Sequence, residues 1–256
     1  MMRTVPGEAI ILAGGLGTRL RPAVSDVPKP MAPVAGRPFL EYLMDYWVHQ
    51  GIRRFVLSIG YKGDLIEAHF GSRFRNCPIS YVQEDTPLGT GGGVRQVLLQ
   101  TQWLSDKAIL INGDTWFEVD IGKLTSDAAS SAQPITIVLK PTDTNDRYGG
   151  VAVDTKGRIS EFGVKTTGKC LINGGCYLFD VATVTNSLRD FPECFSLEEA
   201  FLTPFAREGK VAASIQDGTF LDIGIPTDYA KAVEAIGQAV KTNFDMNNPP
   251  WYQGKY

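Results

Sequence analysis

The feature that most constrains the fold is an alternation of short β-branched runs with longer amphipathic runs in the first half of the chain. The short runs have the length and composition of strands, and the longer ones repeat apolar residues at helical spacing. The predicted strands are Glu8–Ala13, Arg54–Ile59, Ile79–Gln83 and Ala108–Asn112, and the predicted helices are Phe39–Gln50, Lys62–Phe70 and Gly91–Gln100. This order is typical of a mostly parallel sheet with helices on both faces, so we expect an α/β fold.

The second half has a different pattern, in which short strands follow one another with turns between them. Turn residues such as those at 154–157 predict antiparallel pairing. The predicted strands are Ile135–Lys140, Gly150–Asp154, Arg158–Phe162 and Leu171–Phe179, followed by a further hairpin of Val211–Gln216 with Thr219–Asp222. A last helix is expected from Pro226, with Tyr229, Val233, Ile236 and Val240 on one face.

Length and composition favour a single domain spanning residues 1–256. Of the 256 residues, 43% are hydrophobic, which is enough for a sizeable core. The 25 Lys and Arg against 28 Asp and Glu leave a net charge of −3, so no basic field predicts binding to nucleic acid or to an acidic membrane. The sequence has no long apolar run, no signal peptide and no paired cysteine motif, which predicts a cytoplasmic location with reduced thiols.

Helical periodicity is lost from Lys241, and residues 241–256 are expected to form an extended C-terminal arm. Trp251, Tyr252 and Tyr256 in this arm could pack on their own subunit or on a second one. Association into a homo-oligomer is therefore left open.

A glycine-rich segment follows the first predicted strand. It contains Gly14, Gly15 and Gly17, then a threonine and Arg19. Glycines let backbone N–H groups approach a phosphate, and an arginine adds a planar set of donors, so the segment is predicted to bind a polyphosphate. A tight strand-to-helix connection is the alternative. The segment lacks the lysine-containing P-loop pattern, and Leu20 occupies the third glycine position of the dinucleotide-binding pattern.

Ten residues later, Lys29 stands between Pro28 and Pro30, which restrict the backbone around it. A lysine held in this way beside a glycine-rich loop suits an anion. The joint pattern G-G-x-G-T-R-L followed by P-K-P resembles the nucleotidyltransferases that make nucleotide-diphosphate sugars from a nucleoside triphosphate and a sugar 1-phosphate. The resemblance covers nearly all of residues 8–235 and implies a Rossmann-like, mostly parallel sheet with an antiparallel sugar-binding second half, as in glycosyltransferase-A-like folds.

The resemblance also implies that the two halves of the domain bind different substrates. Residues 8–120 are expected to form the nucleotide-binding half, and residues 121–235 the sugar-phosphate half. Arg19, Lys29 and Asp114 are the implied catalytic residues. The implied nucleotide-binding residues are Leu12, Ala13, Gly14, Gly15, Gly17, Thr18, Gln83, Pro87, Gly89 and Thr90. The implied sugar-phosphate-binding residues are Tyr148, Gly149, Lys165, Asn173 and Tyr177. For the two tyrosines, ordinary core or cross-strand packing is the alternative.

One position departs from the family pattern. The segment Phe162-Gly163-Val164-Lys165 has a valine where the family has a glutamate that hydrogen-bonds sugar hydroxyls. The nearby Glu161 need not replace it, because adjacent strand residues point to opposite faces. The contacts to the sugar ring are therefore not carried over intact, and a deoxy variant of the sugar phosphate, such as a deoxy-heptose phosphate, is expected to be tolerated at this edge of the pocket.

Two carboxylates are predicted to hold Mg²⁺. Asp114 follows the fourth predicted strand, at the edge where open α/β sheets bind ligands, and Asp222 precedes the last predicted helix. Mg²⁺ usually takes one or two carboxylates together with substrate phosphates. The alternative is that these aspartates cap a turn and a helix. They can meet only if the later hairpin folds back over the carboxyl edge of the sheet.

Within the family, the motifs most resemble members that use GTP and D-glycero-α-D-manno-heptose 1-phosphate in bacterial surface-polysaccharide synthesis. The alternatives are a mannose 1-phosphate guanylyltransferase and a thymidylyl- or uridylyltransferase for glucose 1-phosphate. A regulatory module that senses nucleotide sugars is disfavoured because Lys29, Asp114 and Asp222 are all present. A Rossmann-type oxidoreductase is disfavoured by the missing glycine and by the antiparallel second half.

Overall fold

The computed structural model describes residues 6–143, 149–165 and 168–241, the last five by their backbone only. The strands are β1 (Glu8–Leu12), β2 (Pro33–Val34), β3 (Arg37–Pro38), β4 (Arg54–Ile59), β5 (Arg73–Phe74), β6 (Cys77–Gln83), β7 (Lys107–Asn112), β8 (Thr115–Phe117), β9 (Ile135–Thr142), β10 (Gly150–Val153), β11 (Ile159–Val164), β12 (Cys170–Asp180), β13 (Val211–Ile215) and β14 (Phe220–Asp222). The helices are α1 (Phe39–His49), α2 (Gly63–Phe70), α3 (Gly89–Gln100), α4 (Ile121–Ser131), α5 (Val181–Leu188), α6 (Thr203–Arg207) and α7 (Pro226–Lys241), with a 3₁₀ turn η1 (Lys29–Met31) and a π-helix η2 (Leu197–Leu202).

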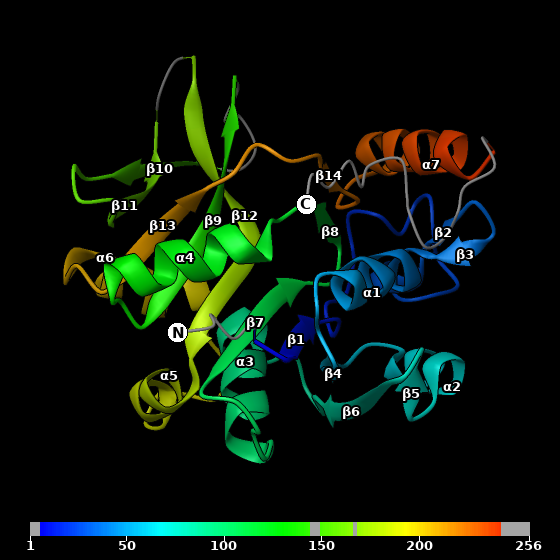
Figure 1. The fold of residues 1–256 in the computed structure, drawn as a ribbon. Coiled ribbons are helices and arrows are strands. Elements are labelled where there is room, and N and C mark those ends of the chain that lie inside the picture. Colours follow the sequence, from blue (N-terminus) through cyan, green and yellow to red (C-terminus); the bar gives the residue numbers. More distant parts are fainter. Residues whose placement is uncertain (1–5, 144–148, 166–167, 242–256) are drawn as a thin grey trace.

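An eight-stranded sheet forms the centre of the molecule, in the order β13-β9-β12-β7-β1-β4-β6-β5 (Figure 1). Strand β1 pairs in parallel with β4 and β7, and β4 pairs in parallel with β6. The strands and helices predicted for the first half are confirmed, with their ends shifted by at most two residues. Helix α1 is followed by Gly51, whose φ of 105° ends the helical path.

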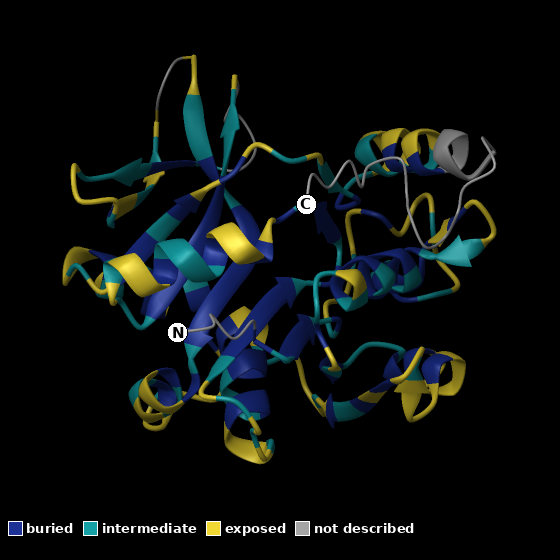
Figure 2. Ribbon diagram, viewed as in Figure 1, coloured by how far each residue is buried: buried dark blue, intermediate teal, exposed yellow. Residues whose placement is uncertain are grey.

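Helices cover both faces of this sheet, as predicted. Side chains alternate along each strand, so Ile11 of β1 packs into a core with α1, α2, α4 and α7, whereas Ile10 packs into a second core with α3, α5 and η2. Figure 2 shows the central strands buried and the outer helix faces exposed. The two cores hold the carboxyl ends of the parallel strands in fixed positions.

The antiparallel second half is also confirmed. Strand β12 pairs antiparallel with both β7 and β9, and β10 pairs antiparallel with β11. The predicted last helix is α7, in which Tyr229, Val233 and Ile236 pack on the core. The arm predicted from Lys241 begins one residue later at the earliest, because Lys241 is still part of α7. The side chain of Val240 and the rest of the predicted arm, with Trp251, Tyr252 and Tyr256, lie outside the described residues. No helix in the described ranges is long and apolar enough to cross a membrane.

The predicted hairpin of Val211–Gln216 with Thr219–Asp222 is wrong. Strand β13 instead pairs in parallel with β9 at the edge of the main sheet, and β14 pairs antiparallel with β8. The main sheet buries Val211 completely, whereas an isolated two-stranded hairpin is marginally stable in water. The backbone N–H of Gln216 donates to the Leu139 carbonyl at 3.0 Å, which extends the pairing with β9 beyond β13.

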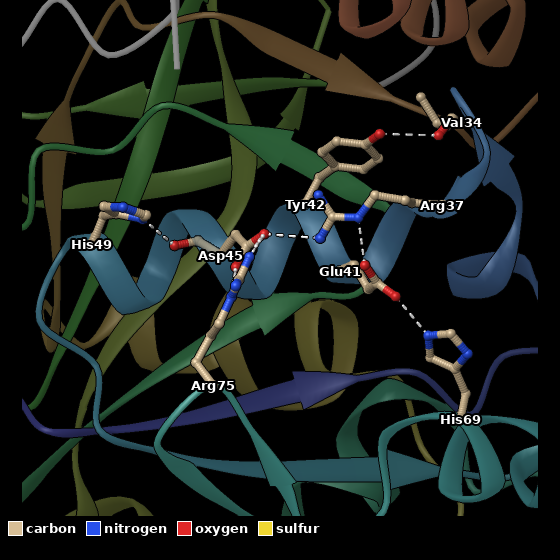
Figure 3. A network of polar contacts seen from close by, with 8 residues as sticks. All are labelled: Val34, Arg37, Glu41, Tyr42, Asp45, His49, His69 and Arg75. Carbon is tan, nitrogen blue, oxygen red and sulfur yellow. Dashed lines mark hydrogen bonds and ion pairs between the residues drawn. The ribbon is translucent and has the colours of Figure 1, made fainter. Parts of the chain in front are cut away.

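A polar network on the outer face of α1 ties this helix to neighbouring segments (Figure 3). The Asp45 carboxylate accepts hydrogen bonds from Arg37 at 2.9 Å and from Arg75 at 2.8 and 3.1 Å. One oxygen of Glu41 accepts from Arg37 at 2.5 Å, and the other contacts His69 at 2.6 Å. Asp45 therefore joins the segment before α1 to the turn between β5 and β6.

We expect Asp45→Ala to lower the free energy of unfolding by about 1–3 kcal/mol, because two guanidinium groups lose a shared acceptor whose side chain is only 13% exposed. Urea unfolding monitored by circular dichroism measures this change. Glu67→Ala, on the exposed face of α2, is the control and should stay within about 0.5 kcal/mol of the parent chain. Equal stability of the two variants would contradict the expectation.

Candidate active site

Two adjoining cavities lie at the carboxyl ends of β1 and β7, the edge where ligands bind in open α/β sheets. Their volumes are about 440 and 340 Å³. The residues that line both cavities are Leu12, Arg19, Lys29, Thr90, Asn112 and Asp114. Ligands in the two cavities would therefore share one wall, which carries the charged side chains of Arg19, Lys29 and Asp114.

The predicted phosphate loop lines the first cavity along its whole length, from residue 12 to residue 19. Gly17 has a φ of +59°, and a Cβ there would lie 3.1 Å from the Cβ of Lys29. A Cβ on Gly60, at the end of β4, would come within 2.9 Å of the Gly14 carbonyl oxygen. Glycine thus permits both a left-handed turn and a close approach of the loop to β4.

Arg19 is exposed and lines both cavities. Its guanidinium makes no hydrogen bond or ion pair with any residue that the structure describes. Because all five guanidinium donors are uncommitted there, Arg19 can bind a phosphate by donating two parallel hydrogen bonds to its oxygens.

Lys29 lies at the start of the 3₁₀ turn η1, with the two prolines beside it as predicted. The Met31 N–H donates to the Pro28 carbonyl at 2.8 Å and closes the turn. The Lys29 ammonium donates to the Asp114 carboxylate and lies 4.0 Å from a carboxylate oxygen of Asp222. One cation thus sits between the two predicted metal ligands, with its side chain only 11% exposed.

Pairing of β14 with β8 brings Asp222 to this place. Asp222 is opposite Thr115 in the register, and the Ile223 N–H donates to the Asp114 carbonyl at 3.0 Å. The chain does fold back over the carboxyl edge of the sheet, as the metal hypothesis requires, although it does so through β8. A carboxylate oxygen of Asp222 also accepts from the Gly224 N–H at 2.6 Å, which orients the side chain.

The donor set at this place fits Mg²⁺. Asp114 and Asp222 present carboxylate oxygens to one cation, and Mg²⁺ is usually bound by one or two carboxylates with substrate phosphates completing the shell. The described residues include no cluster of three or more His, Cys, Asp or Glu that could hold a metal unaided. A metal here would therefore depend on phosphate oxygens from a substrate.

A second glycine-rich segment, residues 87–93, lines the first cavity with some of its residues and packs against residues 193–195 with others. Pro87, Gly89 and Thr90 line the first cavity, as expected of nucleotide-binding residues. Gly91 and Gly92 face away from it. A Cβ on Gly91 would lie 2.2 Å from the Phe195 ring, and one on Gly92 would lie 2.0 Å from the Glu193 carbonyl oxygen. These two glycines admit residues 193–195 against the first turn of α3.

Gly92→Ala should therefore destabilise the fold by about 2 kcal/mol or more, because its Cβ would overlap backbone that cannot move freely. Thermal unfolding of the ligand-free chain measures the effect. Gly15→Ala is the matched control, since nothing lies within 4 Å of the Cβ that it adds. A Gly92→Ala melting temperature equal to that of Gly15→Ala would show that residues 193–195 do not pack as described.

At the end of β6 the structure places Glu84, not Gln83, in the lining of the first cavity. The Gln83 side chain is exposed and donates to the carbonyls of Gly60 and Glu84, at 3.4 and 3.1 Å. The Glu84 carboxylate accepts from the Ser58 hydroxyl at 3.0 Å and from the Leu88 N–H at 3.3 Å. A base contact by Gln83 stays a prediction.

Asn173 and Tyr177 line the second cavity, and the Asn173 amide donates to the Tyr177 hydroxyl at 2.9 Å. Burial raises the pKa of Tyr177, so its phenol stays protonated and its O–H is a donor. Gly149 and Lys165 lie outside the lining of both cavities, and Lys165 is exposed. Tyr148 lies outside the described residues. The roles given to these last three residues stay predictions.

The sequence reasoning missed several cavity residues, among them Asn112, Glu84 and Glu198. Asn112 is the last residue of β7, and Glu84 directly follows β6, so their positions at strand ends were the available signal. Glu198, on η2, has no such signal because η2 reaches the second cavity only through tertiary packing.

A mostly parallel sheet with a glycine-rich loop and two carboxylates at its carboxyl edge is typical of nucleotide-binding proteins. Comparison with known families is consistent with this class. The chain belongs to the Nucleotidyl transferase family, whose pattern matches residues 8–239.

Individual relatives resemble the chain over most of its length. It is 42% identical over 232 residues to the D-glycero-alpha-D-manno-heptose 1-phosphate guanylyltransferase of Aneurinibacillus thermoaerophilus, covering 90% of this chain and 98% of that protein. The protein of the same name from Campylobacter jejuni is 40% identical over 225 residues, covering 87% and 96% of the two chains. Among solved structures, HddC from Yersinia pseudotuberculosis complexed with GMP-PN has a TM-score of 0.77 and 35% identity, covering 90% of this chain and 99% of that one.

Proposed function

We propose that this protein transfers a guanylyl group from GTP to a heptose 1-phosphate, forming a GDP-sugar and pyrophosphate. The observation that carries the proposal is the pair of cavities with a common wall, since Arg19, Lys29 and Asp114 in that wall face both substrates. The first cavity, with the phosphate loop, takes the triphosphate, and the second takes the sugar phosphate. Two relatives at 40–42% identity carry the name of this activity.

In the proposed reaction, an oxygen of the sugar phosphate attacks the α-phosphorus of GTP. A new P–O bond forms, the bond from the α-phosphorus to the bridging oxygen breaks, and pyrophosphate leaves with that electron pair. The nucleophile is already an anion, so no general base is needed. The protein must hold two mutually repelling anions in line and neutralise the developing charge.

Arg19 and the amides of residues 14–18 are assigned to the triphosphate, and Lys29 to the reacting phosphoryl oxygens. Asp114 holds the Lys29 ammonium at the common wall, which orients it toward both cavities. Asp114 and Asp222 would also hold Mg²⁺, which when bound would neutralise phosphate oxygens and help to align them.

Glu84 supports guanine as the base. An ionised carboxylate only accepts hydrogen bonds, and guanine presents neighbouring N1–H and N2–H₂ donors on one edge, a pair that the other bases lack. The Ser58 hydroxyl and the Leu88 N–H hold Glu84 in the cavity lining, each through one oxygen. Further lone pairs on both oxygens remain for the base.

The proposal is tested by pyrophosphate release from four nucleoside triphosphates, each combined with heptose, mannose or glucose 1-phosphate. We expect GTP with D-glycero-α-D-manno-heptose 1-phosphate to have the highest kcat/KM. If mannose 1-phosphate or glucose 1-phosphate gave the higher kcat/KM, that sugar phosphate would be the substrate and the heptose part of the proposal would be wrong. GTP binding without turnover of any pair would favour the regulatory alternative. A cytoplasmic location and association into a homo-oligomer stay predictions from the sequence.

A further inference from the structure

We propose that Glu198 is the carboxylate that recognises hydroxyl groups of the sugar 1-phosphate, an inference that rests on the proposed function. Glu198 lines the second cavity from η2 and forms no ion pair with any described residue. It replaces, from another part of the chain, the carboxylate missing at position 164. Val164 lies on β11 opposite Gly150 of β10, outside the lining of both cavities.

The surroundings of Glu198 suit a polyol. Burial raises the pKa of Glu198, and the adjacent Glu199 adds to this, whereas the Asn173 amide beside it acts in the opposite direction. A partly buried carboxylate has lost hydrogen bonds to water, so it is stabilised by each hydrogen-bond donor that a ligand supplies. A sugar hydroxyl is such a donor and carries no charge. The Tyr177 hydroxyl, which accepts from Asn173, has its own O–H left to donate. The cavity thus offers an acceptor and a donor close together, which is what a ring of hydroxyls requires.

Charge sets the direction of the bound substrate. A phosphate beside Glu198 would be repelled, while Arg19 and Lys29 in the common wall attract it. The phosphate therefore points to the common wall and the hydroxyls point to Glu198. This orientation also presents the phosphate oxygen to the triphosphate in the first cavity.

Glu198 is held in place by the segment that packs on the second glycine-rich loop. The Leu197 N–H donates to the Thr90 hydroxyl at 3.0 Å, and the Gly91 N–H donates to the Phe195 carbonyl at 3.0 Å. A π-helical turn follows, and such turns are frequent at functional sites. Because Thr90 also lines the first cavity, the sugar-contacting carboxylate has a fixed position relative to the nucleotide.

The test compares Glu198→Gln with Glu199→Gln, an exposed neighbour on the same helical turn. Glu198→Gln should raise the KM for D-glycero-α-D-manno-heptose 1-phosphate by about 10- to 100-fold and leave the KM for GTP within about threefold. Glu199→Gln should leave both KM values within about threefold of the parent. A sugar-phosphate KM unchanged in Glu198→Gln, or changed equally in both variants, would overturn the inference.

Monodeoxy analogues of the heptose phosphate supply a second readout that a structural role would not move. One analogue lacks the hydroxyl that donates a hydrogen bond to Glu198. With this analogue the parent should lose about 10- to 100-fold in kcat/KM, because the carboxylate is left unpaired. In Glu198→Ala the same analogue should lose less than about threefold, since no unpaired carboxylate remains. Equal losses in both proteins for every analogue would also overturn it. If the parent chain turns over no sugar phosphate, the proposed function fails instead.

Discussion

Asp114→Asn and Asp222→Asn should each reduce pyrophosphate release from GTP by about a hundredfold or more, a loss of roughly 2.7 kcal/mol in transition-state stabilisation. The substitution keeps the side-chain shape and one oxygen but removes a negative charge. Both carboxylates contact or approach the Lys29 ammonium at the wall shared by the cavities, which is where the proposed reaction needs its charge neutralised. The initial rate at saturating substrates is the measurement.

These variants could lose activity because they bind Mg²⁺ less tightly or because they no longer hold the Lys29 ammonium, and excess Mg²⁺ distinguishes the two causes. If the carboxylates bind the metal, the Mg²⁺ concentration needed for half-maximal rate should rise, and excess Mg²⁺ should restore part of the rate. Asp190→Asn, an exposed residue outside both cavity linings, is the control. Full activity of either variant, or undiminished turnover of the parent in excess EDTA, would exclude the hypothesis that these two carboxylates bind a metal needed for activity.

Arg19→Ala should lower kcat/KM for GTP by about 10²- to 10³-fold, comparable with removal of one preorganised donor at a developing oxyanion. Arg19 has no hydrogen-bond or ion-pair partner in the described part of the chain, so the fold should keep its stability. Arg21→Ala is a matched control two residues away. The Arg21 guanidinium lies 4.6 Å from the centroid of the Tyr61 ring and outside both cavity linings.

Arg19→Lys separates charge from geometry. A lysine keeps the positive charge but lacks the planar fork that binds two phosphate oxygens, so it should recover only a minor part of the lost activity. Initial rates over a range of GTP concentrations measure all three variants. Equal kcat/KM for Arg19→Ala and Arg21→Ala would exclude a phosphate contact by Arg19.

The parallel half and the placement of its loops were predictable because the signals are local. Burial on one helix face produces the spacing seen in α1, and continuous burial produces the β-branched runs of β1 and β4. The phosphate loop and Lys29 are short-range features too, since glycine and proline act on their own backbone. Their joint pattern also carried the family resemblance.

The pairing of β13 and β14 was not predictable from the same signals. A two-residue gap between two strands is typical of a hairpin, but β13 gains more by burying its apolar residues at the edge of the main sheet. The choice depends on a competing partner, β9, that lies about seventy residues earlier in the chain. That competition also freed β14 to pair with β8.

By itself, the sequence determined the alternating architecture, the glycine-rich loop and the candidate carboxylates, because each is a property of neighbouring residues. Only the tertiary structure decided that Asp222 meets Lys29 through β8, that Gly91 and Gly92 serve packing, and that Glu198 lines the second cavity. These outcomes depend on which distant segments bury the most surface against each other. Local spacing contains no record of that long-range energy balance.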